Sequence, residues 1–485
     1  MTLTSCLAEA ARRFADAPAY VAENGLELSY SELHRLSDEV AAGLSQRGIG
    51  AGDVLALALP TIPEYFVCYL AAAKLGAITA GVNTRLSPVE QDAVLRVAGP
   101  ALVLRELDVC VATTVDEMLD GWRVRGASPD PIDDDPDRPI ALVFTSGTTG
   151  LPKGVLFCNR QLDAVTAIDV GDRWGGGPRA LASTSLAHLG PMTKLAGNLR
   201  GGGTTYLMRK WSAGTALRAV AEHGINFLGG IPTQVALMLE HPSFESTDLS
   251  SVQAIVIGGG PATPALVRHA RARFGVPLAV RYSCTEAAIG CGTRFDDPPE
   301  DAEVSVGRAQ AGVVLSLLDD DDKPVPDGEV GHVCLRSGAV MAGYWKDPEA
   351  TGAAFTPDGS VRTGDLGWID DRSRLHLAGR SKEMYVRGGY NVHPQEVEAV
   401  LAEHPDVAAV CVVPRPDDVM GEIGVAFVVA RGGRQAPALE SLRAFGADRL
   451  AAYKLPEDLR VVHALPLTSM DKVDRKALVA RLAGS

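Results

Sequence analysis

The sequence has no cysteine or histidine pattern of the kind that binds zinc. Its eight cysteines are scattered, without a Cys-x-x-Cys pair or a Cys/His cluster. Structural zinc sites and disulfide frameworks both require such spacing, so neither is expected. We therefore predict reduced, buried thiols in a cytoplasmic protein.

Long hydrophobic runs are also missing. The most apolar segment, Val54 to Val82, is interrupted by two prolines, Glu64 and Lys74, which favours a buried strand, a turn and a helix over a membrane span. Residues 1–18 lack the apolar core of a signal peptide and instead show an amphipathic helical pattern. We expect neither secretion nor a transmembrane segment.

Basic residues are outnumbered, with 46 Lys and Arg against 60 Asp and Glu, and the formal net charge is −14. Nucleic-acid binding and binding to anionic membranes both need a basic surface, so these functions are disfavoured. An anionic ligand would have to be held by a few local groups. The length of 485 residues exceeds one ordinary hydrophobic core and predicts at least two domains.

A glycine- and hydroxyl-rich loop follows the apolar run from Ile140 to Phe144. It reads Thr-Ser-Gly-Thr-Thr-Gly-Leu-Pro-Lys-Gly and ends at Gly154. Glycines let backbone N–H groups approach an anion, while hydroxyls and a lysine add donors and charge. The spacing is not that of a P-loop NTPase, because no Ser or Thr follows the lysine. An ordinary turn is the alternative. The predicted phosphate-binding residues are Thr145, Ser146, Gly147, Thr148, Thr149, Gly150 and Lys153.

Alternating strand and helix patterns predict an α/β fold with a large N-terminal domain of βα units. The clearest unit has a strand at Ala254–Gly258, a turn at 259–262, a helix with Leu266, Ala270 and Phe274 on one face, and a strand at Leu278–Tyr282. Such a unit implies parallel strands, whose carboxyl ends gather ligands.

Shorter elements follow Gly379 and predict a small α+β C-terminal domain. We expect helices at 394–403 and 439–450, and strands at 407–413, 424–430 and 459–463. Pro394 suits a first helical position because its missing N–H has no partner there anyway. The predicted division is an N-terminal domain over 1–378, a hinge at 379–382 and a mobile C-terminal domain over 383–485.

The phosphate loop and further motifs, taken in order, resemble the adenylate-forming (AMP-binding) superfamily, of the acyl-CoA synthetase type. The resemblance covers nearly the whole chain. The motifs after the loop are Leu186–Gly190, Tyr282–Glu286, Thr363–Asp365, Gly379–Pro394 and Leu465–Lys476.

The resemblance implies roles for the nucleotide-binding residues. Tyr282 would stack on adenine, Thr285 would bond the α-phosphate, and Glu286 with Thr145 would hold Mg²⁺. Asp365 would accept the ribose hydroxyls, and Arg380 would contact the ribose or phosphate side. Standing alone, each of these residues would instead fit a structural position in the core, on the surface or in a turn. The strand-end residues Gly259, Gly260 and Pro261 are further nucleotide-binding candidates.

The resemblance also implies an acyl pocket and a moving catalytic lysine. Lys472 would be catalytic, together with Thr285, Glu286 and His188, and Lys382 would be the hinge residue. The Gly388–Gly389 loop would serve the coenzyme A half-reaction; an ordinary hairpin turn is the alternative. Asp471 replaces the family's usual glycine, and it would pair with Lys472 or stiffen the loop. Ser283 replaces another glycine. The predicted acyl-pocket residues are Trp174, His188, Ile231, Gly258 and Ser283.

The implied function is an ATP-dependent ligase that activates a fatty or related carboxylic acid as its acyl-adenylate and transfers it to coenzyme A. The implied cofactors are ATP, Mg²⁺ and coenzyme A. The alternative enzyme delivers the acyl group to the pantetheine of a carrier protein or to another small nucleophile. A nucleotide-binding protein without catalysis is the alternative from another class.

Overall fold

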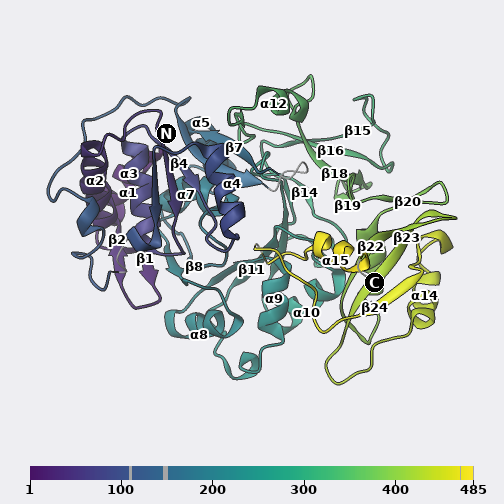
Figure 1. Ribbon diagram of the computed structural model, residues 1–485. Helices are drawn as coiled ribbons and strands as arrows, with labels where there is room; N and C mark the ends of the chain where they lie inside the picture. The colour runs from purple at the N-terminus through teal and green to yellow at the C-terminus, as the bar shows by residue number, and fades with distance from the viewer. Residues whose placement is uncertain (109–111, 146–150, 470, 484–485) are drawn as a thin grey trace.

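The computed structural model describes residues 1–108, 112–145, 151–469 and 471–483. These residues form four sheets, of nine, six, four and five strands, in a mixed α/β arrangement (Figure 1). The predicted fold class is confirmed: a large N-terminal part of βα units carries a small C-terminal α+β unit. None of the described helices is long and apolar enough to cross a membrane.

The largest sheet contains the predicted βαβ unit. Its strands run in the order β14-β13-β12-β11-β10-β8-β9-β1-β2, and the central ones are parallel. Helices α8, α9 and α10 pack on one face through Val220, Val235 and Val267, against Ile257 and Val280 of the sheet. The strands are β1 (Pro18–Ala22), β2 (Glu27–Ser29), β8 (Arg179–Ala182), β9 (Thr204–Leu207), β10 (Phe227–Gly230), β11 (Ala254–Gly258), β12 (Leu278–Tyr282), β13 (Cys291–Gly292) and β14 (Arg308–Ala309).

The helix of that unit, α10 (Pro264–Phe274), is defined by local signals. The Thr263 side chain caps its N-terminus by accepting from the Leu266 N–H, Pro264 occupies the first turn, and Gly275 ends it in the left-handed region. Both flanking strands have the predicted bounds, so this prediction is confirmed.

The second sheet is buried against helices from the N-terminal part. Strands β5, β3, β4 and β6 are parallel, while β7 and β17 pair antiparallel at one edge. Helix α3 (Pro63–Lys74) is buried along its whole length, as the apolar segment at 54–82 predicted. The strands are β3 (Val54–Ala58), β4 (Ile78–Gly81), β5 (Leu102–Arg105), β6 (Pro139–Thr145), β7 (Lys153–Cys158) and β17 (Gly343–Tyr344).

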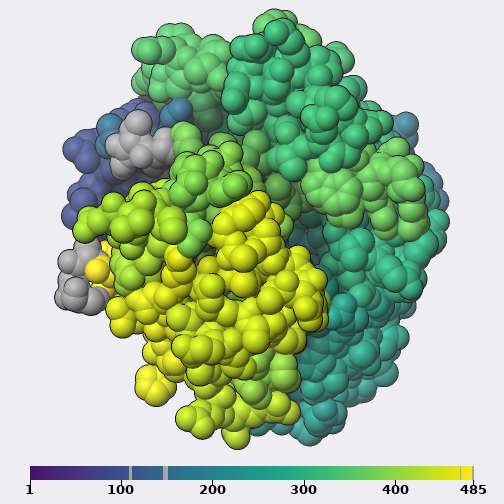
Figure 2. Space-filling model, turned by 90° about the vertical axis from the view of Figure 1, so that its right-hand side faces the viewer, coloured from purple at the N-terminus to yellow at the C-terminus, as the bar shows by residue number. Residues whose placement is uncertain are grey.

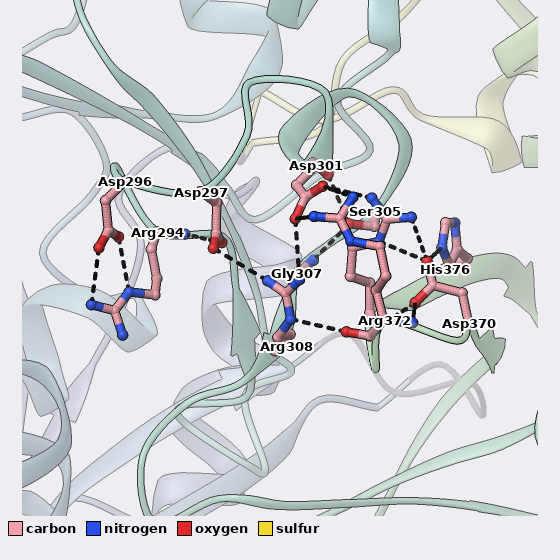
Figure 3. A network of polar contacts seen from close by, with 11 residues as sticks. Arg294, Asp296, Asp297, Asp301, Ser305, Gly307, Arg308, Asp370, Arg372 and His376 are labelled. Atoms are coloured by element: carbon pink, nitrogen blue, oxygen red, sulfur yellow. Dashed lines mark hydrogen bonds and ion pairs between the residues drawn. The ribbon is translucent and has the colours of Figure 1, made fainter.

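The third sheet, in the order β15-β16-β18-β19, is antiparallel and is tied to the first by a buried carboxylate (Figure 3). Asp301 is fully buried, and its oxygens lie 2.6–3.3 Å from guanidinium nitrogens of Arg308, Arg372 and Arg374. The network holds the β18–β19 hairpin in place. The strands are β15 (Val314–Leu318), β16 (Gly331–Arg336), β18 (Val361–Ile369) and β19 (Leu375–Arg380).

The fourth sheet belongs to the C-terminal unit, which lies across one face of the larger part (Figure 2). The predicted elements are present, with bounds that differ by a few residues. Strand β22 extends to Asp417 and β23 begins at Gly421, whereas β24 ends at Val461 and helix α14 ends at Ala447, both earlier than predicted. The strands are β20 (Tyr385–Arg387), β21 (Tyr390–Val392), β22 (Val407–Asp417), β23 (Gly421–Ala430) and β24 (Asp458–Val461).

The connection between the third and fourth sheets is a turn at 381–384. Strand β19 continues through Arg380, and β20 begins at Tyr385. Lys382 is exposed within this turn. The remaining helices are α1 (Leu3–Phe14), α2 (Tyr30–Gln46), α4 (Pro88–Ala98), α5 (Asn159–Asp169), α6 (Leu189–Thr193), α7 (Leu195–Gly201), α8 (Ala213–His223), α9 (Pro232–Leu239), α11 (Asp301–Val304), α12 (Pro348–Ala354), α13 (Pro394–Leu401), α14 (Leu439–Ala447) and α15 (Arg475–Ala483).

Replacing the buried carboxylate is expected to destabilise the N-terminal part strongly. Asp301→Asn leaves three guanidinium groups around a neutral amide, at a cost of about 3–5 kcal/mol in the free energy of unfolding. Urea unfolding followed by circular dichroism measures this. The control, Asp296→Asn, removes the exposed pair with Arg294 and is expected to cost less than about 1 kcal/mol. Equal losses in the two variants would contradict the anchoring role.

Candidate active site

A cleft of about 3600 Å³ lies between the N-terminal part and the C-terminal unit. Its walls include the residues that follow several parallel strands: Asn83 after β4, Ile231 after β10, Gly259 after β11 and Ser283 after β12. Ligands gather where the carboxyl ends of parallel strands meet, so this is the expected location of a site.

A chain of three side chains forms one wall of the cleft. The Tyr282 hydroxyl donates to Asp365 Oδ2 at 2.7 Å, and Arg380 Nε lies 3.0 Å from Asp365 Oδ1. Asp365 and Arg380 face each other in the β18–β19 register. Tyr282 and Arg380 line the cleft and cover the carboxylate, which is 7% exposed.

Burial raises the pKa of the Asp365 carboxyl above its usual value. The Arg380 charge and the Tyr282 hydroxyl lower this pKa, but they offset the effect of burial only in part. Among the residues that the structure describes, each carboxylate oxygen has one side-chain partner. A carboxylate has about four lone-pair sites, so two sites are left for further donors. A pair of neighbouring hydroxyls on a ligand fits this remaining capacity.

Glu286 and Lys153 both contact a tyrosine that also lines the cleft. The Tyr344 hydroxyl donates to Glu286 Oε1 at 2.8 Å, and Lys153 Nζ lies 4.6 Å from the centre of the same ring. The β7–β17 pairing aligns Tyr344 with Val155 and so fixes this contact. A carboxylate and an ammonium group are thereby held beside Thr145, which ends β6 and pairs with Lys153. The loop residues Ser146, Gly147, Thr148, Thr149 and Gly150 lie outside the described residues.

His188 lies beside Asn83 at the end of β4. Asn83 accepts from the Arg85 N–H through Oδ1 at 3.0 Å, so its amide nitrogen, 3.3 Å from His188 Nε2, is positioned to donate to the ring. Burial lowers the pKa of His188 to about 4, with added repulsion from Lys472 and Arg85. His188 is therefore neutral near pH 7.

Lys472 reaches this cleft from the C-terminal unit. Its side chain is accessible from the cleft, but the surrounding protein displaces water and lowers its pKa; Arg380 adds repulsion, while Asp365 opposes both effects. No carboxylate of the described residues forms an ion pair with Lys472. The neighbouring Asp471 pairs instead with Arg85 of the N-terminal part, so the predicted alternative of an Asp471–Lys472 pair is wrong.

The predicted acyl-pocket residues all line the cleft. His188, Ile231, Gly258 and Ser283 follow or end strands of the sheets, and Gly259, Gly260 and Pro261 continue from β11. Gly259 has a φ of +75° and lies close to the Ile231 side chain, so a larger residue is disfavoured there. Trp174 also lines the cleft, but its ring packs against Phe14 and lies under the guanidinium groups of Arg13 and Arg200.

Two predicted residues lie away from the cleft. Gly388 and Gly389 form the exposed turn of the β20–β21 hairpin, and neither is among the described residues that line the cleft. Both have positive φ angles, of 55° and 86°, as a tight hairpin turn requires. In this arrangement Gly388 and Gly389 form a hairpin turn, which is the alternative that the sequence analysis gave for them.

Several polar residues that line the cleft were not predicted, among them Asn83, Arg85, Arg281 and Tyr344. Asn83 and Arg85 directly follow the buried strand β4, and polar residues after a parallel strand are a usable signal. Arg281 precedes Tyr282 on β12, and its Nη1 donates to the backbone carbonyl groups of Val280 and Thr293. Tyr344 lies in a Gly-Tyr-Trp sequence that carries no chemical signal without its pairing partner.

Comparison with known proteins gives consistent matches along the chain. The family model described as AMP-binding enzyme matches residues 7–345, and the one described as AMP-binding enzyme C-terminal domain matches residues 396–472. An indoleacetate–CoA ligase of Aromatoleum aromaticum is 33% identical over 94% of each chain. A fatty acid–[acyl-carrier-protein] ligase, ScoC of Streptomyces coeruleorubidus, is 31% identical over 96% of this chain and 94% of its own.

The fold also matches solved structures over its whole length. The amide bond synthetase McbA from Marinactinospora thermotolerans superposes with a TM-score of 0.87 at 28% identity, and 99% of each chain is covered. The three relatives use different acceptors according to their names. The matches therefore share a chemistry of acid activation without sharing one acceptor.

Acidification is expected to reveal the depressed pKa of His188. The unfolded chain binds a proton near pH 6.5, whereas folded His188 binds it only near pH 4, so its contribution to stability is complete above pH 6.5 and is lost as the pH falls toward 4. Between pH 7 and pH 5 the wild type is expected to lose about 2 kcal/mol more unfolding free energy than His188→Asn. Urea unfolding at both pH values measures the difference, and parallel losses would show that His188 has an ordinary pKa.

Proposed function

The chain belongs to the AMP-binding, adenylate-forming enzyme family, and from this premise we propose that it is an acid–thiol ligase that makes an acyl-CoA. Adenylate formation is the activity that the family and its relatives share. Coenzyme A as the acceptor, and the roles of the individual residues, are proposed for this chain.

One observation carries the proposal: Lys472 of the C-terminal unit lines the same cleft as Tyr282 and Arg380 of the proposed nucleotide wall. A nucleotide bound along Tyr282, Asp365 and Arg380 would present its α-phosphate toward Lys472. Because no carboxylate of the described chain pairs with this ammonium group, it is available to neutralise charge on a ligand.

The proposed first half-reaction is attack of a carboxylate oxygen on the α-phosphorus of ATP, which releases pyrophosphate and leaves an acyl-adenylate. Asp365 would accept the ribose hydroxyls, and Tyr282 would pack on adenine. Lys153 would bind the outer phosphates, and Lys472 would bridge the carboxylate and the α-phosphate as charge develops. Placement of the two reactants supplies much of the acceleration.

The metal-binding residues fit a magnesium ion that is shared with ATP. Glu286 Oε1 accepts from Tyr344, and Oε2 has no partner among the described residues. Mg²⁺ commonly takes one or two protein oxygens and completes its shell with phosphate and water, as Glu286 and Thr145 would allow. When bound there, Mg²⁺ would offset the charge of the phosphates.

The proposed second half-reaction is attack of the coenzyme A thiol on the acyl carbon, with AMP as the leaving group. It would require the C-terminal unit to turn about 381–384, which withdraws Lys472 and moves the Gly388–Gly389 turn. A carrier-protein pantetheine or an amine would use the same adenylate, so the acceptor has to be tested directly. Seven described cysteines are free, buried thiols, which suits the reducing cytoplasm in which we place the enzyme.

The acyl site is proposed to lie among the strand-end residues beside His188. Neutral His188, Ile231 and Gly258 offer a weakly polar surface at the strand ends. Arg281 adds a guanidinium group that is partnered by backbone carbonyls. This mixture suits a carboxylic acid with an apolar body and accommodates a polar substituent.

A pyrophosphate-release panel tests both halves of the proposal. Fatty, aromatic and arylacetic acids are each incubated with ATP and Mg²⁺, with and without coenzyme A, and products are identified by mass spectrometry. Acid-dependent pyrophosphate release with an acyl-CoA product supports the proposal. Release with an acyl-adenylate that only a carrier protein or an amine consumes would reassign the acceptor, and no release with any acid would contradict adenylate formation by this chain.

Loss of the lysine is expected to separate the two half-reactions. Lys472→Ala removes a preorganised charge at the reacting phosphate and is expected to raise the adenylation barrier by about 3–4 kcal/mol, or about 10²- to 10³-fold in rate. Transfer from a preformed acyl-adenylate to coenzyme A is expected to stay within about 3-fold of the wild type. Lys476→Ala, four residues along, is the control, and an equal loss there would contradict the choice of lysine.

A further inference from the structure

A two-pronged ion pair joins the C-terminal unit to the N-terminal part directly beside the catalytic lysine. Arg85 Nη1 donates to Asp471 Oδ2 at 2.8 Å, and Nη2 donates to Oδ1 at 2.5 Å. Asp471 is 19% exposed and Arg85 is 49% exposed. Paired bonds from one guanidinium to one carboxylate fix orientation as well as distance.

The backbone of Asp471 shows that this position has an unusual requirement. Its φ is +58°, in the left-handed region where glycine is favoured and a side chain is strained. Aspartate tolerates this region better than most residues, but a glycine would occupy it without strain. A glycine would lack the carboxylate to which Arg85 donates.

The loop around Asp471 transmits the position of the pair to Lys472. Within the loop, the Asp471 N–H donates to the Thr468 carbonyl at 3.0 Å, and the Thr468 N–H donates to the Lys472 carbonyl at 2.7 Å. Leu467 and Val473 form a β-bridge at its base. Because these bonds close the loop on itself, holding the Asp471 carboxylate also holds the backbone of its neighbour Lys472.

The other side of the pair is equally well positioned. Arg85 follows Asn83, whose side chain accepts from the Arg85 N–H and contacts His188. Asn83 Nδ2 also donates, at 3.5 Å, to the carbonyl of Ser469 in the lysine loop. The segment at 83–85 thus contacts the loop twice, from a strand end that belongs to the rigid N-terminal part.

We propose that Arg85 and Asp471 form an interdomain clasp that positions Lys472 for adenylation and must open before acyl transfer. The inference rests on the proposed two-step function. Arg85 and Asp471 act as positioning residues, since they touch Lys472 only through the loop. The strength of the clasp then sets the relative populations of the two domain arrangements in which the half-reactions take place.

A double-mutant cycle of Arg85→Gln, Asp471→Asn and the double variant tests the clasp. Asparagine tolerates a positive φ, so Asp471→Asn removes the charge with little change in backbone strain. The adenylation rate is measured with the acid identified by the pyrophosphate panel. Each single variant is expected to lower this rate about 3- to 10-fold. The double variant is expected to be no slower than the single variants, because all three lack the same ion pair. Transfer from preformed acyl-adenylate is expected not to slow.

Two controls distinguish the clasp from other surface ion pairs. Arg434→Gln breaks the pair with Asp406 inside the C-terminal unit. Glu403→Gln breaks a 3.5 Å contact with Arg268 that also joins the two units, together with a pair to Arg449 inside the C-terminal unit, and it is distant in sequence from the lysine loop. Both are expected to leave the ratio of the half-reaction rates unchanged. If the ratio of the two half-reaction rates changes as much in these controls as in the Arg85 and Asp471 variants, the clasp assignment is wrong.

A distance measurement tests the clasp without a known acid. Spin labels are attached at Ser250→Cys in the N-terminal part and Asp448→Cys in the C-terminal unit, both at exposed positions. The Cys110→Ser background leaves only buried native cysteines. The distance between the labels reports domain orientation with ATP and Mg²⁺ alone. Arg85→Gln is expected to broaden the distribution of distances between the labels relative to the wild type. The broadening is expected to be larger at low salt than at high salt, because high salt already weakens the clasp in the wild type.

If Arg85→Gln and Asp471→Asn keep the wild-type distance distribution, or slow both half-reactions equally, the clasp does not exist. Failure to release pyrophosphate with any acid would refute the proposed function and leave this measurement intact.

Discussion

The meeting of Lys472 and Arg380 in one cleft is the constraint on which the proposed site depends. Both are cations, they come from different units, and both line the cleft; burial lowers the pKa of Lys472, and repulsion from Arg380 lowers it further. The chain as a whole carries a net charge of −14, so this positive cluster is a local property. Two cations in one cleft raise the electrostatic energy when no anion is present, and a bound anion lowers it. A phosphate chain is therefore favoured to bind where these groups meet.

The two cations are held in different ways. Arg380 lies on strand β19, whose hairpin is anchored through the fully buried Asp301 and its three arginines (Figure 3). Lys472 lies in a loop of the C-terminal unit, which lies against the N-terminal part (Figure 2), and it lines the cleft between them. The proposed nucleotide wall is therefore anchored within the N-terminal part, whereas the charge proposed to act on the α-phosphate belongs to the C-terminal unit. A reaction in two steps benefits from this separation, because one group has to leave after the first.

The sequence predicts the parts of this design that depend on local patterns. The unit from Ala254 to Tyr282 is found with its predicted strand bounds because alternating burial, an N-cap and a terminal glycine all agree there. The grouping of Tyr282, Asp365 and Arg380 followed from motif resemblance. The contact between Tyr344 and Glu286 did not, because it depends on the pairing of β7 with β17, which are far apart in sequence. Arg85 and Asp471 were missed as a pair for the same reason: only the docked domain arrangement joins them.

Asp471 shows why a departure from a family pattern can be informative. A non-glycine residue in the left-handed region costs on the order of 1–3 kcal/mol, while it also limits the freedom of the unfolded loop. In the docked state the pair with Arg85 offsets this strain, but in any state where the units separate the pair is absent and the strain is unbalanced. The substitution therefore couples the conformation of the lysine loop to domain docking more tightly than glycine would. A glycine would leave the loop without this tie to the N-terminal part, whereas the aspartate, through Arg85, holds the backbone beside Lys472 in the arrangement proposed for adenylation.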